Sequence, residues 1–255
     1  MNYDDFLLII KKQKFYVYGA GSKGKRFIKC LENMGIKQNF LGYVVTEENH
    51  TYKSILDIPR ESYVIISTHN ETAKEMERLL INNQFKHYYL LYPFLLELEY
   101  GKSIEKNKKI NVNDLLNNLD STPYYAILML TIDSVIKGYN NDAIYIKMME
   151  KLSSDRKTAL ARSKEFYSRI IDYSKGNYNK ENYPIKVNAE KDKIIDGAHR
   201  LMLAYYFGKT TINADIYDFK QEKYDEIFYK LREFNTNWEK SYSNEEIKII
   251  KGYLK

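Results

Sequence analysis

The segment FYVYGAGSKG, residues 15–24, decides the fold class of the first part of this chain. Its apolar run ends at a glycine, as a buried strand does, and residues 23–34 then carry apolar side chains at the spacing of one helix face. The alternation continues with predicted strands and one more helix, at 40–45, 63–67 and 88–91 and at 71–83. Strands that alternate with helices are typical of a mostly parallel sheet, so residues 1–100 are predicted to be an α/β domain.

Three glycines of this segment, Gly19, Gly21 and Gly24, fit the pattern G-x-G-x-x-G between a strand and a helix. Glycines permit a tight turn and a close approach of a ligand, and the helix start offers free N–H groups to an anion. They are therefore candidate cofactor-binding residues. The alternative is that they serve only strand-to-helix packing, because the second strand ends without the acidic residue that binds a ribose, Glu47 coming only after Thr46.

The runs VYGAG (17–21), FLGYVV (40–45) and VIIS (64–67) resemble the small Rossmann-like domains attached to bacterial surface-polysaccharide biosynthesis proteins. The resemblance covers about residues 1–100. It implies an association with cell-envelope carbohydrate metabolism.

The composition changes after this domain. Residues 101–113, GKSIEKNKKINVN, are polar, basic and without periodicity, which predicts a linker. Helical patterns follow at 124–137 and 142–151, so residues 101–150 are predicted to be a linker and helical connector. A helix at 155–173, strands at 184–187, 193–195 and 210–217, and a helix at 198–207 predict an α+β domain over residues 151–255.

Composition limits the possible functions. The 40 Lys and Arg residues are interleaved with 34 Asp and Glu, so the net charge of +6 makes DNA an unlikely partner. One cysteine, Cys30, leaves no intrachain disulfide, and the four histidines form no zinc motif. No apolar run reaches the roughly 18 residues that span a bilayer, and the first residues lack the polarity of a signal peptide. We expect a cytoplasmic protein without membrane insertion; a homo-oligomer is possible.

The segment Asp196-Gly197-Ala198-His199-Arg200 is the candidate active site. A strand delivers the chain to Asp196, and a helix begins at Ala198. A phosphate at this helix start would meet backbone N–H groups, the helix dipole, an imidazole and a guanidinium. Asp196 would bind Mg²⁺ or accept a proton from a substrate hydroxyl. The alternative reading makes Asp196 a helix N-cap and places His199 and Arg200 on the surface.

The runs PIKV (184–187) and KIIDGAHR (193–200), with Ala204 and Gly208, resemble the ParB/sulfiredoxin-like fold, over about residues 153–217. Its members include CTP-binding partition proteins, ATP-dependent sulfiredoxins and free-serine kinases. The resemblance implies that the turn and the helix start hold nucleotide phosphates. Sulfiredoxins place a cysteine in this turn, where this chain has Ala198, and no basic recognition helix of the partition proteins follows.

The serine-kinase branch of that fold has an acidic catalytic base well upstream of the turn. By this resemblance Asp155 is the candidate base, with Glu165 as the runner-up. Arg156, Lys157 and Arg162 lie in the same region and could contact phosphates, but they are interpreted as solvated helix charges.

The sequence therefore predicts a nucleotide-dependent small-molecule kinase that uses ATP, or another nucleoside triphosphate or diphosphate, with Mg²⁺. The acceptor would be a hydroxyl of a sugar, a polyol or an amino-acid-like metabolite. The predicted catalytic residues are Asp196, His199, Arg200 and Asp155, with Asp196 as the metal ligand; Gly197, Ala198, Gly19, Gly21 and Gly24 are the predicted cofactor-binding residues. Two alternatives stay open: a non-catalytic nucleotide- or DNA-binding protein of the ParB-like superfamily, and a non-catalytic scaffold in polysaccharide assembly.

Overall fold

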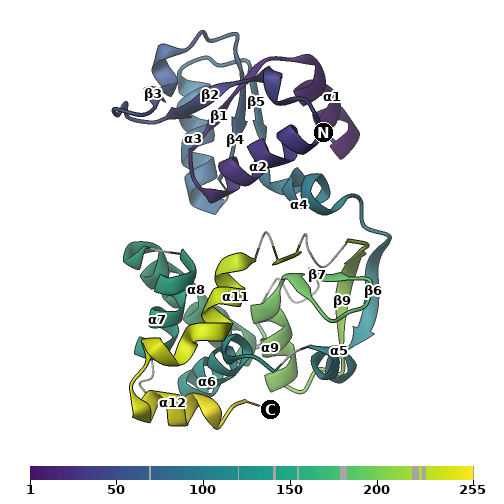
Figure 1. Cartoon of the computed structure of the whole chain (residues 1–255), viewed down its shortest axis with the longest axis vertical. Helices are drawn as coiled ribbons and strands as arrows, with labels where there is room; N and C mark the ends of the chain where they lie inside the picture. Colours follow the sequence, from purple (N-terminus) through teal and green to yellow (C-terminus); the bar gives the residue numbers. More distant parts are fainter. Residues whose placement is uncertain are drawn as a thin grey trace. The chain divides into compact units, whose positions relative to one another are not determined.

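The chain forms two compact units, unit 1 (Met1–Lys102) and unit 2 (Ser103–Lys255), each with an α/β arrangement (Figure 1). The structure is a computed structural model. It describes residues 1–68, 70–119, 121–139, 142–153, 155–178, 183–219, 224–225 and 228–254. Each unit is considered by itself.

Unit 1 contains a five-stranded parallel sheet in the order β3-β2-β1-β4-β5. Its strands are β1 (Phe15–Tyr18), β2 (Phe40–Val45), β3 (Lys53–Ser54), β4 (Tyr63–Ile66) and β5 (His87–Leu90). Its helices are α1 (Tyr3–Lys12), α2 (Ser22–Asn33), α3 (Asn70–Asn82) and α4 (Tyr92–Tyr100). The predicted parallel α/β sheet is confirmed, and the strand order reverses between β1 and β4, next to the glycine turn.

The two faces of this sheet are covered by different helices. Neighbouring residues of a strand point to opposite faces. Val17 and Ile65 therefore pack with α1, α2 and α4, whereas Val64 and Ile66 pack with α3. Because both faces of the sheet are covered, the central strands β1 and β4 are mostly buried apolar runs, and this made them recognisable in the sequence.

Unit 2 combines a four-stranded mixed sheet, in the order β6-β9-β7-β8, with a group of packed helices. Its strands are β6 (Glu105–Asn111), β7 (Ile185–Asn188), β8 (Ile194–Asp196) and β9 (Thr211–Tyr217). Its helices are α5 (Val112–Asn118), α6 (Pro123–Lys137), α7 (Asp142–Ser153), α8 (Arg156–Ser174), α9 (Ala198–Tyr206), α11 (Tyr229–Asn237) and α12 (Asn244–Lys251). The strands β7 and β9 are parallel, and the other two pairs are antiparallel.

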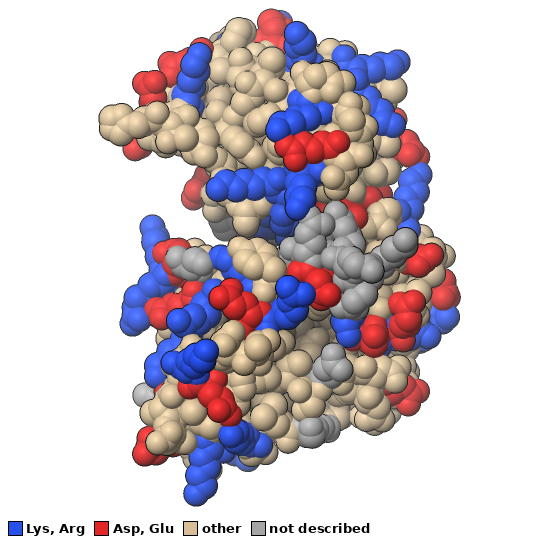
Figure 2. Space-filling model, in the orientation of Figure 1, with Lys and Arg blue, Asp and Glu red and all other residues tan. Residues whose placement is uncertain are grey.

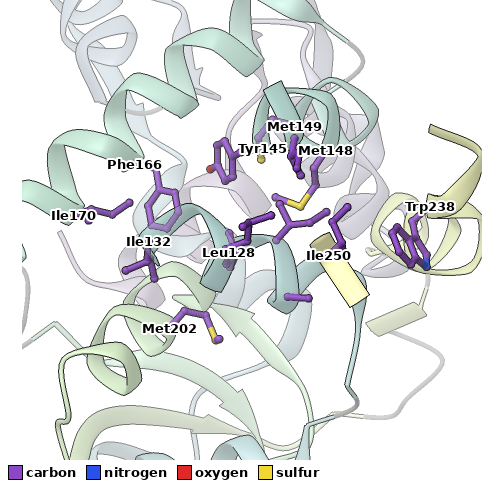
Figure 3. Packing of buried hydrophobic residues seen from close by; sticks show 14 of the residues in the cluster. Leu128, Ile132, Tyr145, Met148, Met149, Phe166, Ile170, Met202, Trp238 and Ile250 are labelled. Atoms are coloured by element: carbon purple, nitrogen blue, oxygen red, sulfur yellow. The ribbon is translucent and has the colours of Figure 1, made fainter. Parts of the chain in front are cut away.

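Helix α9 lies between the sheet and the helices of unit 2. Leu201 and Ala204 pack with the sheet, whereas Met202 and Leu203 pack with α6, α7 and α8. Figure 3 shows Met202 in the helical core with Tyr145 of α7 and Phe166 of α8. The start of α9 is therefore placed where the sheet and the helices meet.

The predicted linker over 101–113 is wrong, because Glu105–Asn111 forms the edge strand β6. Only Ile110 of β6 is buried, so its side chains show no apolar alternation. Backbone pairing with β9 alone makes this segment a strand. The predicted connector is also part of unit 2, since α6 and α7 share one core with α8 and α9.

Among the helices that the structure describes, none is long and apolar enough to cross a membrane.

Candidate functional site

The turn between β8 and α9 requires a glycine. Gly197 has φ +99° and ψ +15°, in the left-handed region. A Cβ at this position would lie 2.5 Å from Cγ2 of Ile185. Gly197 is also the N-cap of α9, and no side chain of the described residues caps this helix. The first N–H groups of α9 therefore keep their donor capacity and their positive potential.

Arg200 stabilises the approach to this turn. Its Nη1 donates to the carbonyl oxygens of Tyr183 (2.8 Å) and Pro184 (3.1 Å), and its Nη2 donates to Oδ2 of Asp196 at 3.1 Å. The guanidinium thus joins the entry to β7 with the end of β8. Asp196 is not a side-chain cap of α9, and its side chain remains 43% exposed.

His199 points to the helices of unit 2. Its Nε2 forms a 2.8 Å hydrogen bond with the hydroxyl of Tyr145. The ring of Phe166 lies edge-on to the imidazole, with the centroids 4.4 Å apart, and the ring of Tyr124 lies at 6.5 Å. The side chains of His199 and Arg200 therefore extend from different sides of α9 and have different partners. The expected pair of imidazole and guanidinium side by side is not observed.

The imidazole of His199 is held neutral. Burial lowers its pKa, and the charges of Arg169, Arg162 and Arg200 lower it further, to about 3. At neutral pH His199 is therefore a hydrogen-bonding group and not a cation. The positive charge of the site is on the three arginines.

Two of these arginines belong to α8. Arg162, Phe166 and Arg169 occupy positions i, i+4 and i+7, which share one face of a helix. Arg169 pairs with Glu165, whereas Arg162 is exposed and forms no ion pair with any residue that the structure describes. The exposure of Arg162 agrees with its interpretation as a solvated charge. The sequence analysis did not single out Arg169.

Tyrosines complete the surroundings of His199. Burial raises the pKa of Tyr124 to about 12; the charge of Arg162 opposes this shift and that of Asp196 adds to it. The hydroxyl of Tyr178 is buried and has no hydrogen-bond partner among the described residues. Burial raises the pKa of Tyr178 as well, while the charges of Arg169 and Arg200 lower it. Protonated phenols, which are hydrogen-bond donors, thus accompany the arginines.

Asp155 is the N-cap of α8. Its carboxylate accepts hydrogen bonds from the backbone N–H groups of Lys157 (3.2 Å) and Thr158 (2.8 Å), and from the Thr158 hydroxyl. These bonds lower the pKa of this exposed carboxyl group. The hydrogen-bond partners of the Asp155 carboxylate among the described residues are all local, and its predicted role as a catalytic base stays a prediction.

The glycine turn of unit 1 is shaped by packing at two of its three glycines. A Cβ at Gly19 would lie 2.8 Å from Oγ of Ser67, and one at Gly24 would lie 2.6 Å from the carbonyl oxygen of Gly19. A Cβ at Gly21, the N-cap of α2, would meet open space. Packing therefore accounts for Gly19 and Gly24, while Gly21 alone is left for a ligand-binding role, which stays a prediction.

We expect the stability of unit 2 to depend on pH through His199. The unfolded pKa near 6.5 exceeds the folded pKa of about 3, so the unfolded state binds the extra proton between these values. Stability is thus lost as the pH falls below 6.5, by about 2 kcal/mol between pH 7 and pH 5. Urea unfolding, followed by the fluorescence of Trp238, measures this loss, because Trp238 is the single tryptophan and lies in the core of unit 2.

The matched variant is His199→Gln, which keeps a polar side chain but does not titrate. Its stability should change much less between pH 7 and pH 5. Equal losses in the variant and the wild type would contradict the assignment.

No family model, no curated protein and no solved structure matches this chain.

Proposed function

We propose that unit 2 binds the phosphates of a nucleoside triphosphate beside Arg162, Arg169 and the start of α9, and transfers a phosphoryl group to a hydroxyl of a small molecule. The observation that carries this proposal is the start of α9, which no described side chain caps and which Arg200 borders through its bond to Asp196; the charges of Arg162 and Arg169 also act on His199 there. An anion at this helix start would be attracted by the positive charges that act on His199.

The charges near His199 do not cancel. Arg162, Arg169 and Arg200 are opposed by Asp196, which pairs with Arg200, and by Glu165, which pairs with Arg169. Arg162 has no such partner among the described residues. Charge-assisted bonds from a guanidinium to phosphate oxygens are among the strongest in proteins, and a helix start adds N–H donors.

Asp196 is the residue that we propose as the proton acceptor. The acceptor hydroxyl oxygen would attack the γ-phosphorus, and the bond from this phosphorus to the β–γ bridging oxygen would break, releasing the nucleoside diphosphate. The hydroxyl proton would pass to the oxygen of Asp196 that Arg200 does not occupy. The neutral His199 and the guanidiniums would stabilise the charge on the transferred group.

Mg²⁺ would neutralise charge on the nucleotide phosphates. The described residues contain no cluster of three or more His, Cys, Asp and Glu side chains that could hold a metal ion. If Asp196 does not accept the proton, its carboxylate instead fits the mode in which Mg²⁺ is held by one protein carboxylate, phosphate oxygens and water.

The test uses Arg162→Ala, because this exposed side chain is not part of the core. We expect the dissociation constant for Mg²⁺-ATP, or for the nucleotide that binds best, to rise at least about tenfold in calorimetric titration. Transfer is then followed by ³¹P NMR with sugars, polyols and hydroxy amino acids as acceptors.

The control is Lys164→Ala. Lys164 is exposed on the opposite side of α8, so this variant loses the same charge without touching the site. Its nucleotide affinity should equal that of the wild type. Absence of nucleotide binding by the wild type, or equal weakening in both variants, would refute the proposal.

The non-catalytic alternative is supported by the existing hydrogen bonds of both acids, Asp155 as an N-cap and Asp196 to Arg200. Under this alternative, we expect the protein to bind nucleotide without forming a phosphorylated product. DNA remains an unlikely ligand, since acidic and basic side chains are interleaved on the face of unit 2 seen in Figure 2.

A further inference from the structure

A cavity of about 320 Å³ adjoins the proposed phosphate site. It lies between the start of α6, the turn from β7 to β8, and residues 224–225 and 228–236, which include part of α11. Tyr124 belongs to both sites: it lines the cavity, and the centroid of its ring lies 6.5 Å from that of His199. Tyr124 is therefore the residue through which this cavity adjoins the surroundings of His199.

One wall of the cavity is aromatic. Tyr224 and Phe228 are stacked, with ring centroids 4.5 Å apart and an angle of 24° between the rings. Such faces favour a planar ligand, and the stacking of a nucleobase on an aromatic side chain contributes to affinity for every base. An aromatic wall by itself would also suit an apolar ligand. The polar side chains of the cavity therefore decide which class of ligand it binds.

Two polar side chains of the cavity have unused hydrogen-bonding capacity. The Oγ1 of Thr122 is buried and has no hydrogen-bond partner among the described residues. Asn235 accepts a long bond of 3.4 Å from the backbone N–H of Tyr124, through Oδ1. Its amide group therefore keeps two donors, and a carboxamide with a donor and an acceptor matches the edge of a nucleobase. An apolar ligand would leave these groups unsatisfied.

The charges that line the cavity cancel. The negative charges of Asp192 and Asp225 are balanced by the positive charges of Lys193 and Arg232. A lining without net charge does not attract a phosphate group, but it can hold an uncharged ring. The phosphates of a nucleotide are thus directed to the arginines around His199, and the uncharged part to this cavity.

We infer that the cavity holds the base of the nucleotide, stacked on Phe228 and hydrogen-bonded by Asn235 and Thr122. This inference rests on the proposed function, because the phosphates provide the anchor. It adds that the protein distinguishes a nucleotide from bare phosphate.

The experiment compares ATP, GTP, CTP and UTP with inorganic tripolyphosphate, all with Mg²⁺, by calorimetric titration of the full chain. We expect at least one nucleotide to bind the wild type about tenfold more tightly than tripolyphosphate. Phe228→Ala and Asn235→Leu should remove this preference and leave the affinity for tripolyphosphate unchanged. Arg162→Ala should weaken both kinds of ligand.

The outcomes separate the two proposals. If tripolyphosphate and all four nucleotides bind the wild type equally, the base site is refuted and the phosphate site stands. If nothing binds, both are refuted. The wild-type comparison decides the matter even if Phe228→Ala fails to fold, and Asn235→Leu provides a second variant.

Discussion

Replacing Arg26 by methionine is expected to lower the free energy of unfolding of unit 1 by about 3 kcal/mol. Arg26 on α2 donates to Glu99 on α4 through Nε, at 2.6 Å, and through Nη2. The Glu99 side chain is only 1% exposed. Without Arg26 a carboxylate remains buried and unpaired, and this penalty, not the lost attraction, dominates the effect.

The single cysteine provides the measurement. Cys30 is buried at 4% exposure in α2, one turn after Arg26, and the chain has no other thiol. Its reaction with a thiol reagent, after equilibration in urea, reports the unfolded fraction of unit 1. We expect the midpoint to fall by about 1 M urea or more.

Two controls isolate the buried charge. Lys37→Met breaks an exposed pair with Glu32 in the same unit and should cost less than about 1 kcal/mol. The double variant Arg26→Met/Glu99→Leu removes both charges and should recover most of the stability. A double variant as unstable as Arg26→Met would show that the ion pair is not the cause.

Gly197→Ala is expected to lower the free energy of unfolding of unit 2 by about 2–5 kcal/mol. An alanine at φ +99° is strained, and its Cβ would lie 2.5 Å from Cγ2 of Ile185, which is fully buried in the core. It would also lie 2.9 Å from Nη2 of Arg200, the atom that bonds Asp196. Strain, overpacking and a disturbed ion pair therefore act together.

The fluorescence of Trp238 in urea measures this effect. The control is Gly208→Ala, because Gly208 also has a positive φ, +72°, but a Cβ there meets nothing within 4 Å. This control keeps only the backbone strain and should cost about 1 kcal/mol. Equal effects at the two glycines would mean that close contact at the turn is unimportant.

Most strands and several helices could be predicted from local pattern. The central strands of unit 1 are mostly buried apolar runs, and α8 follows the N-cap Asp155 and repeats its apolar residues at helical spacing. The capping box of α1, formed by Asn2 and Asp5, was also readable, although the prediction did not use it. The edge strand β6 was not readable, because its only signal is pairing with β9, far away in the chain.

The local backbone structure of the candidate site was predicted, but the directions of its side chains were not. Residues 196–200 do form the end of a strand, a left-handed glycine and the start of a helix. Neighbouring positions of a helix are about 100° apart, however, so His199 and Arg200 contact different partners. Arg162 and Arg169 belong to α8, a helix that precedes the turn. Because these residues are far from His199 in the sequence, their effect on its pKa could not be inferred from the sequence.

The sequence by itself determined the parallel sheet of unit 1, the glycine turns and the start of α9, because backbone conformation and hydrophobic period depend on residues close together in the chain. Only the tertiary structure decided that the imidazole is neutral, that the arginines of α8 face it, and that Arg200 stabilises the turn. The physical reason is that burial and charge–charge interactions are set by distance in space, which the packing of α9 between the sheet and the helices creates.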